Sequence, residues 1–248
     1  MKIHALILLC MASLTFSASA NIYREAVDNP NRSAKEREID SKRKPDQVLE
    51  FFEIQPGMDV LDVFAGGGYY TEILSYLVGQ KGSVTLFNNN PWQAFAAKAV
   101  EDRLKNNRLP NVKPLITKPE ALDAQNKQYD AALFILGMHD LYYADPKQGW
   151  VAIDRSKFLK AIYNSLKPGA IFGVIDANAM QGVDNEKIGH KLHRVDPATL
   201  IEDVIDAGFV LTEQSDVLRN PNDDKNTSVF LPKNRYNTDR SVLKFRKI

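Results

Sequence analysis

Short apolar runs alternate with helix-like segments over most of the chain, and glycine or proline marks the boundaries between them. The first run, residues 58–63, follows Gln55-Pro56-Gly57 and leads through three glycines into a helical segment, Tyr69–Leu77. A second run, Ser83–Asn88, follows another break. Runs that are apolar throughout are typical of strands buried on both faces of a parallel sheet, so this stretch predicts a β-α-β unit.

The same alternation continues to the end of the chain. Further helices are predicted over Pro45–Phe52, residues 91–104, Ser156–Leu166 and Pro197–Ala207, three of which begin at a proline. Further strands are predicted over Val112–Ile116, Tyr129–Gly137, Ala170–Ile175, Phe209–Leu218 and Ser241–Ile248. In the helix 91–104 we expect Phe95, Ala96, Ala99 and Val100 to face inward. This order favours an α/β fold with a doubly wound sheet and right-handed crossovers.

The first twenty residues have the pattern of a signal peptide. Lys2 precedes an apolar run, Ala5–Phe16, which is too short to span a membrane comfortably, and the segment ends in Ala-Ser-Ala at Ala20. We expect cleavage before Asn21 and a protein exported to the periplasm, with no membrane span after cleavage; an uncleaved anchor is the alternative. The single cysteine, Cys10, lies within this segment, so the mature chain has no cysteine chemistry.

The rest of the chain suits one domain. Residues 21–45 are polar and weakly periodic, which indicates an arm or short helices laid over the domain 46–248. Removing Lys2 lowers the formal net charge from +1 to 0. The densest basic cluster, Lys42-Arg43-Lys44, is too short to indicate a nucleic-acid partner, so we expect a small-molecule partner and no nucleic acid. Oligomeric state does not follow from the sequence.

Candidate chemistry gathers where the predicted strands end. The first strand ends in Asp62, followed by a turn, Ala65–Gly68, whose glycines allow backbone N–H groups to approach a ligand closely. A glycine turn can also be purely structural. Later strands end at Asn88, His139-Asp140 and Asp176. Ligands of such sheets bind outside the carboxyl ends of the strands, so we expect a site at this edge.

The order of these motifs resembles that of class I S-adenosylmethionine-dependent methyltransferases over about residues 47–175. Within that superfamily the chain is similar to a group of exported predicted methyltransferases. The shared segments are residues 40–45, the glycine turn and helix 66–74, His139-Asp140-Leu141-Tyr142, residues 193–197 and residues 220–224. The resemblance implies a Rossmann-like sheet of seven strands, mostly parallel, with an antiparallel last strand, and S-adenosylmethionine as cofactor.

The resemblance also implies roles for individual residues. Those implied to bind the cofactor are Asp62, Phe64, Ala65, Gly66, Gly67, Gly68, Asn88 and Glu120. Two of them depart from the pattern of the superfamily: Phe64 stands where the first glycine is usual, and Asn88 replaces the acid that usually holds the ribose hydroxyls. An amide can still bond a hydroxyl group, but without the charge-assisted component. These departures also fit a protein that has kept the fold and lost the cofactor.

For the chemistry we select His139 and Asp140 as catalytic candidates, because histidine titrates near neutral pH. His139 can instead be a loop histidine bonded to a backbone carbonyl. We expect no metal site, although Asp140, Asp176 and Asn178 offer oxygen ligands of the kind that magnesium accepts. The spacing of His190 and His193 alone does not establish a zinc site.

Several other residues keep two interpretations. Asp196 is expected to cap the helix that begins at Pro197, and Arg194 either binds a substrate anion or pairs with an acid. Tyr142 and Tyr143 either line an acceptor pocket or pack in the core. At the level of the protein, we expect a methyltransferase acting on a small molecule or envelope component. The alternatives are a non-catalytic binding module and an interaction protein with the same fold.

Overall fold

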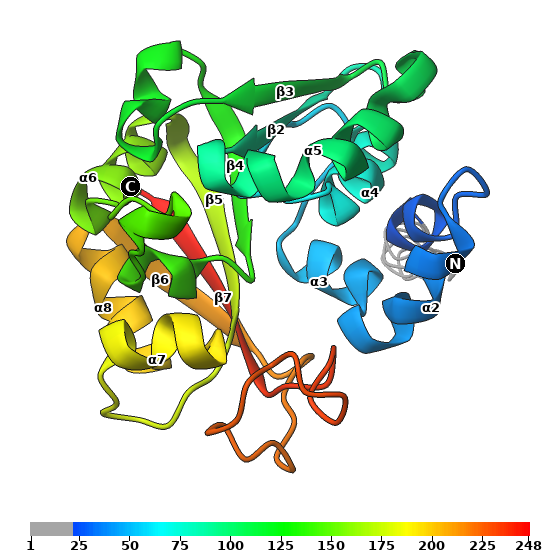
Figure 1. Ribbon diagram of the computed structural model, residues 1–248. Coiled ribbons are helices and arrows are strands. Elements are labelled where there is room, and N and C mark those ends of the chain that lie inside the picture. Colours follow the sequence, from blue (N-terminus) through cyan, green and yellow to red (C-terminus); the bar gives the residue numbers. More distant parts are fainter. Residues whose placement is uncertain (1–21) are drawn as a thin grey trace, which may run out of the picture.

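The computed structural model describes residues 22–248, and its centre is one sheet of seven strands in the order β3-β2-β1-β4-β5-β7-β6 (Figure 1). The strands are β1 (Asp59–Val63), β2 (Ser83–Asn88), β3 (Val112–Ile116), β4 (Tyr129–Ile135), β5 (Leu166–Ala177), β6 (Phe209–Ser215) and β7 (Arg240–Lys247). The first five pair in parallel, and β7 pairs antiparallel with both β5 and β6. The expected fold class and the antiparallel last strand are therefore confirmed.

Helices cover both faces of the sheet, as the alternating pattern predicts. The α-helices are α2 (Ala34–Arg43), α3 (Pro45–Phe51), α4 (Tyr69–Val78), α5 (Asn90–Leu104), α6 (Arg155–Asn164), α7 (Asn185–Leu192) and α8 (Pro197–Asp206). Short 3-10 helices are η1 (Lys105–Asn107), η2 (Pro119–Gln125), η3 (Met138–Tyr142) and η4 (Pro146–Gln148). The hydrophobic core on one face includes α3 and α4, and that on the other includes α6 and α8.

Helix α5 packs differently from the prediction. Ala96 and Val100 are buried as expected, but Phe95 is 84% exposed and Ala99 is also exposed. The inward face of α5 is therefore narrower than an apolar stripe of four residues. The reason is that α5 lies at the edge of the sheet beside the glycine turn, where only one side of the helix meets other elements.

The N-terminal arm is anchored to the domain. Residues 22–27 are helical, and Tyr23 and Val27 are buried in the core. Arg32 forms a bidentate ion pair with Asp40 of α2, at 2.7 and 2.9 Å. The arm thus shares the core of the domain, while its placement as a separate segment 21–45 remains an interpretation.

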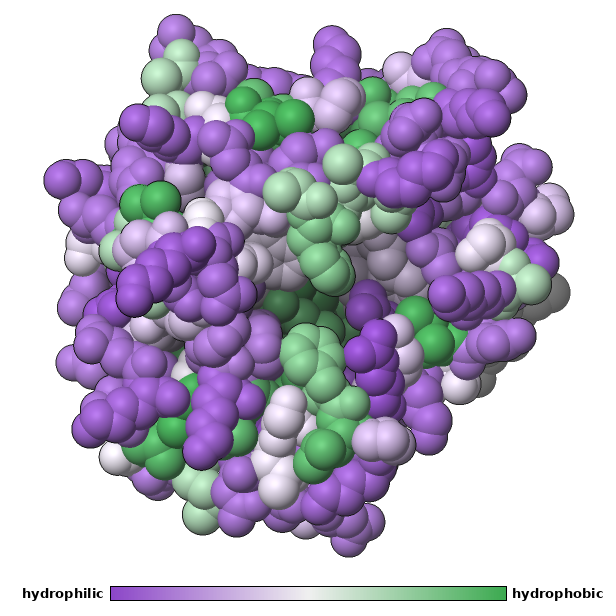
Figure 2. Space-filling view, in the orientation of Figure 1, coloured by the Kyte–Doolittle hydropathy of each residue, from purple (hydrophilic) through white to green (hydrophobic). Residues whose placement is uncertain are grey.

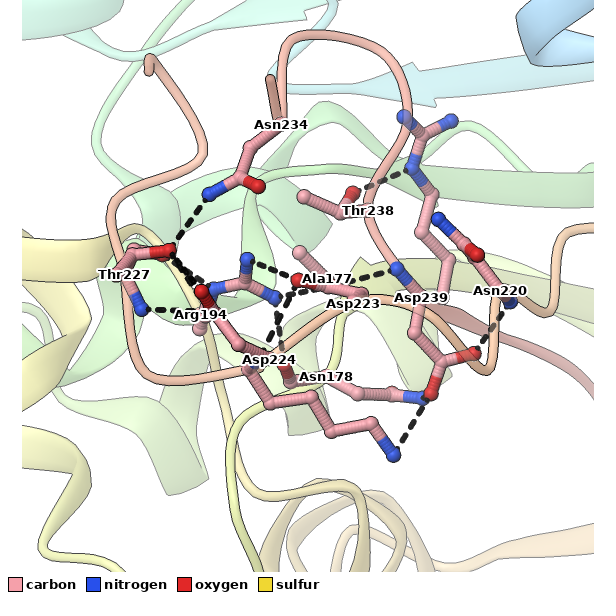
Figure 3. A network of polar contacts seen from close by, with 12 residues as sticks. Ala177, Asn178, Arg194, Asn220, Asp223, Asp224, Thr227, Asn234, Thr238 and Asp239 are labelled. Carbon is pink, nitrogen blue, oxygen red and sulfur yellow. Dashed lines mark hydrogen bonds and ion pairs between the residues drawn. The ribbon is translucent and has the colours of Figure 1, made fainter. Parts of the chain in front are cut away.

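The connection between β6 and β7, residues 216–239, is long and held by buried polar contacts (Figure 3). Arg194 is fully buried and forms a bidentate pair with Asp223 at 2.7 and 2.9 Å. Asp239 accepts a hydrogen bond from Asn178 at 3.0 Å. Because Asn178 lies directly after β5, these contacts fasten the connection to the carboxyl edge of the sheet.

The expected signal peptide, residues 1–20, and its cysteine lie outside the described residues. Within residues 22–248, every helix is too short or too polar to cross a membrane.

Candidate functional site

The glycine turn lies at the carboxyl end of β1 and is tied to β2 through Asn88. The Gly66 N–H donates to Asn88 Oδ1 at 3.0 Å, and Asn88 Nδ2 donates to the Gly66 carbonyl at 3.1 Å. An aspartate at this position can accept the first bond but cannot donate the second. The amide therefore stabilises the turn in a way that the acid usual in the superfamily cannot.

Phe64 shows how the turn forms without its usual first glycine. Its backbone adopts φ of 49°, a left-handed conformation that suits glycine and costs a phenylalanine on the order of 1–3 kcal/mol. The ring is 2% exposed and packs against Phe87, Phe134 and Phe158, with Trp92 stacked 6.0 Å away between ring centroids. Aromatic packing offsets the backbone strain.

The three glycines make room for α5. A Cβ atom at Gly66 would lie 3.2 Å from the Trp92 ring, and one at Gly67 would lie 2.9 Å from the Ala99 Cβ. At Gly68 it would lie 2.9 Å from the side chain of Arg103. The space beside these glycines is therefore filled by side chains of α5. Glycine is required at these positions for α5 to pack, whether or not a ligand binds.

Asp62 projects from the end of β1 into a buried setting. Its carboxyl group accepts a hydrogen bond from the Thr71 hydroxyl at 2.5 Å. Burial raises the pKa of Asp62 to about 7, against the lowering effect of the bonds from Thr71. Asp62 thus shares the carboxyl edge with Asn88 and the glycine turn, as the sequence predicts.

Glu120 lies apart from these residues in its contacts. It belongs to η2, and its carboxylate accepts a hydrogen bond from the backbone N–H of Asp154, 2.9 Å away, at the start of α6. In the described structure Glu120 therefore joins two segments on one face of the sheet, and its assignment to the adenine remains a prediction.

His139 and Asp176 form a buried, hydrogen-bonded pair at this edge. His139 Nδ1 lies 2.9 Å from Asp176 Oδ1, and the His139 backbone N–H donates to Asp176 Oδ2 at 3.0 Å. On the other side of the ring, His139 Nε2 lies 3.2 Å from His193 Nδ1 and 3.5 Å from Asp140 Oδ1. The partner Asp176 comes from β5, a neighbour in space that sequence spacing alone does not pair with His139.

The surrounding charges shift the pKa values of His139 and His193 in opposite directions. Burial alone lowers the pKa of His139, but the carboxylates of Asp176 and Asp140 outweigh it and raise the pKa to about 9. Burial and the charge of His139 lower the pKa of His193 to about 4. At neutral pH His139 is therefore an imidazolium that can donate a hydrogen bond to neutral His193. In this state it can hold a negative charge but cannot accept a proton.

The same cluster offers metal ligands that the sequence analysis did not combine. One ligand atom from each of His139, Asp140 and His193 lies within 4.8 Å of the others. The magnesium set considered above, with Asn178, is not assembled, because both polar atoms of the Asn178 amide bind Asp239 and Ser241. A divalent transition metal is the type of ion that two imidazoles and a carboxylate suit.

The remaining candidates have structural partners. Asp196 caps α8 by accepting from the Ala198 N–H at 2.9 Å, as expected. Arg194 is paired with an acid, and Tyr142 donates to Asp203 at 2.5 Å. Tyr143 stacks on His190 with ring centroids 3.7 Å apart. These contacts favour packing over pocket lining.

A small, narrow pocket lies at the carboxyl ends of β4 and β5. We call it the arginine pocket; it is lined by Arg43, Tyr70, Ile135, Leu136, Ile175, Leu218 and Arg240. In the space-filling view, the face between α5 and the C-terminal connection is hollowed, and the surface inside the hollow is hydrophobic (Figure 2). In the arginine pocket, Arg43 of the arm and Arg240 of β7 therefore lie next to apolar side chains of β4 and β5.

The residues at β1 do not accommodate a whole S-adenosylmethionine as they stand. Pockets for ligands of such size measure about 300–1,000 Å³, whereas the arginine pocket is filled by its own lining side chains. The cradle beside the glycines is filled by α5. At Gly66 the obstacle is the side chain of Trp92. Moving that indole would open the cradle.

Comparison with known proteins identifies the fold. The sequence model of the protein-L-isoaspartate(D-aspartate) O-methyltransferase family matches residues 16–117. A ubiquinone/menaquinone biosynthesis C-methyltransferase of Shewanella sediminis (strain HAW-EB3) is 27% identical over 135 residues, which are 54% of this chain and 48% of that protein. The match thus spans about half the length of that curated relative.

Solved structures resemble nearly the whole chain. A S-adenosylmethionine-dependent methyltransferase from Aquifex aeolicus has a TM-score of 0.56 at 20% identity, covering 93% of this chain and 98% of that one. A putative sarcosine dimethylglycine methyltransferase from Galdieria sulphuraria has a TM-score of 0.58 at 16% identity, with the same coverage of both chains. The fold is therefore the class I methyltransferase fold, and the comparisons together support a methyltransferase with S-adenosylmethionine as cofactor.

Proposed function

We propose that this chain is an S-adenosylmethionine-dependent methyltransferase that acts on a small molecule or envelope component. The observation that carries the proposal is the gathering of Asp62, the glycine turn and Asn88 at the carboxyl ends of β1 and β2. This is the edge at which doubly wound sheets bind their ligands. The similarity to methyltransferases supports the same reading.

The cofactor supplies an activated methyl group when bound, so the protein's own task is to orient the acceptor and exclude water. We assign the cofactor side to Asp62, residues 64–68, Asn88 and Glu120, and the acceptor side to His139 and Asp140. With a pKa of about 9, His139 is protonated at neutral pH and can bind an ionised acceptor through its positive charge. It serves as a base only above about pH 9.

Binding requires the N-terminal end of α5 to move, because Trp92 lies over Gly66. This requirement provides a direct test. The chain has two tryptophans, so a Trp150→Phe variant reports on Trp92 alone. We expect S-adenosylhomocysteine to change the tryptophan emission of this variant and to bind with micromolar affinity by isothermal titration calorimetry.

Two substitutions on β1 give a matched pair. Asp62→Ala, at the carboxyl end, should weaken the binding of S-adenosylhomocysteine at least tenfold. Asp59→Asn, at the opposite end of the same strand, should leave it unchanged. Absence of binding, with unchanged Trp92 emission, would favour a non-catalytic protein that keeps the fold.

The cellular location is a separate proposal. We infer export to the periplasm from the signal-peptide pattern of residues 1–20. Mass spectrometry of the protein recovered from a periplasmic fraction tests it. A mature N-terminus at Asn21 is expected, and recovery of the uncleaved chain in the cytosol would contradict it.

A further inference from the structure

The arginine pocket combines two cationic side chains with an apolar floor. Arg240 is 3% exposed, and its Nε donates to the Thr238 hydroxyl at 3.0 Å. Arg43 packs its guanidinium over the Tyr69 ring, 4.3 Å from the centroid, and its Nε is buried without a hydrogen-bond partner. Both arginines thus have donor capacity beyond their contacts with uncharged groups.

In the described part of the chain neither arginine forms a direct ion pair, although the carboxylates of Asp176 and Asp223 lie within electrostatic reach of Arg240. Within residues 22–248, neither Arg43 nor Arg240 forms an ion pair with a carboxylate, whereas Arg32, Arg103 and Arg194 each do. Burial and the charge of Arg43 lower the pKa of Arg240 to about 10, and the two carboxylates offset this only in part. A bound anion would offset both effects.

The surrounding elements fix the positions of the two arginines. Arg43 is the last residue of α2, and Arg240 is the first residue of β7. The polar network of the β6–β7 connection, with Asp223 and Asp239 at its centre, fastens the segment that leads into β7 (Figure 3). The side chain of Arg240 is therefore presented by an ordered segment.

The pocket is bounded by the ends of β4 and β5. Leu136 lines the pocket, directly follows β4 and has a backbone φ of 59°. Residues other than glycine rarely adopt this left-handed conformation, and such strained residues cluster at binding sites. Ile175 of β5 also lines the pocket and directly precedes Asp176, the partner of His139. The pocket and the His139–Asp176 pair therefore share the carboxyl edge of β5 but lie on opposite faces of the strand.

We propose that the arginine pocket binds a carboxylate or phosphate group of the methyl acceptor. An anion fits the paired guanidinium groups, which hold carboxylates and phosphates through charge-assisted hydrogen bonds. The lining side chains fill the pocket as it stands, so an anion enters only if the Arg43 side chain, at the end of α2, moves aside. That the anion belongs to a methyl acceptor rests on the proposed methyltransferase function, whereas the anion site itself does not depend on it.

The strand order separates this pocket from the place assigned to the cofactor's ribose. Asn88 ends β2, on one side of β1, whereas the pocket lies at β4, β5 and β7, on the other side. A ligand in the pocket therefore approaches the glycine turn from the side opposite the nucleoside. This position favours the acceptor over the cofactor as the source of the anion.

Titration calorimetry with inorganic phosphate, at constant ionic strength, tests the site on the full chain. We expect one phosphate to bind, and Arg43→Gln and Arg240→Gln each to weaken it about 10- to 100-fold, as expected for loss of a charge-assisted bond. Lys42→Gln, an exposed neighbour on α2, is the matched control and should bind as the wild type does. If Arg240→Gln fails to fold, Arg43→Gln and the conservative Arg240→Lys carry the test. Equal binding by wild type and both Gln variants, or no binding by the wild type, would overturn the anion site.

Repeating the titration with saturating S-adenosylhomocysteine separates the two sources of the anion. Unchanged phosphate affinity supports the acceptor, and displacement of phosphate overturns that assignment in favour of the cofactor carboxylate. If S-adenosylhomocysteine does not bind while phosphate binding still depends on both arginines, the methyltransferase proposal fails and the anion site stands.

Discussion

Replacing Asp176 by asparagine should lower the pKa of His139. In the wild type, burial lowers the pKa of His139, and the carboxylates of Asp176 and Asp140 together raise it to about 9. Asp176 is the closer of the two, at 2.9 Å against 3.5 Å for Asp140. In Asp176→Asn the effect of burial dominates, so we expect the pKa of His139 to fall below 6.5.

The size of the stability effect follows from the same values. The difference between the ordinary pKa of 6.5 and the value of about 9 in the folded protein corresponds to about 3 kcal/mol. Because the folded state binds the proton more tightly, this stabilisation is complete below pH 6.5 and is lost as the pH rises through about 9. The variant should therefore be about 3 kcal/mol less stable than the wild type at pH 6, with a smaller difference at pH 9.5.

Two measurements check this prediction. NMR titration of ¹³C-labelled histidine Cε1 gives the pKa directly, and a His139→Gln variant assigns the resonance among the four histidines of the chain. Urea unfolding at pH 6 and pH 9.5 gives the stability difference. Asp140→Asn, which removes the more distant charge, should lower the pKa less. A His139 that still titrates near pH 9 in Asp176→Asn would refute the reasoning.

Three further changes have defined outcomes. Gly67→Ala should destabilise the chain by about 1–3 kcal/mol in urea unfolding through its clash with Ala99, and Ala99→Gly should rescue it, since the two atoms would be only 2.9 Å apart. Arg194→Gln should cost about 3–5 kcal/mol by the same assay, because it leaves buried Asp223 without its partner. If His139 acts as the base, methyl transfer should rise with pH up to about 9 and be insensitive to EDTA; loss of turnover on chelation would instead indicate a metal held by that histidine.

The fold was predictable because its signals are local. Buried parallel strands leave continuous apolar runs, and proline and glycine mark where they stop, so strand and helix positions agree with the structure to within a few residues for most elements. Helix α7 was missed because its sequence, Asn185–Leu192, is short and polar. The inward position of Phe95 was wrong, since α5 contacts the domain along a narrower strip than its apolar pattern indicates.

The site was only partly predictable because its partners come from distant segments. Sequence placed Asp62, Asn88 and His139 at one edge, but not the pairing of His139 with Asp176, which depends on the neighbouring strands β4 and β5. Arg240 gave no signal in the sequence, since it follows a long irregular connection.

Hydrogen exchange of the chain with and without S-adenosylhomocysteine tests the central claim most directly. The account predicts slower exchange of the backbone amides in the turn 64–68, where the ligand would lie against β1. Unchanged exchange in that turn at saturating ligand, or protection confined to other segments, would contradict a cofactor site at the end of the first strand.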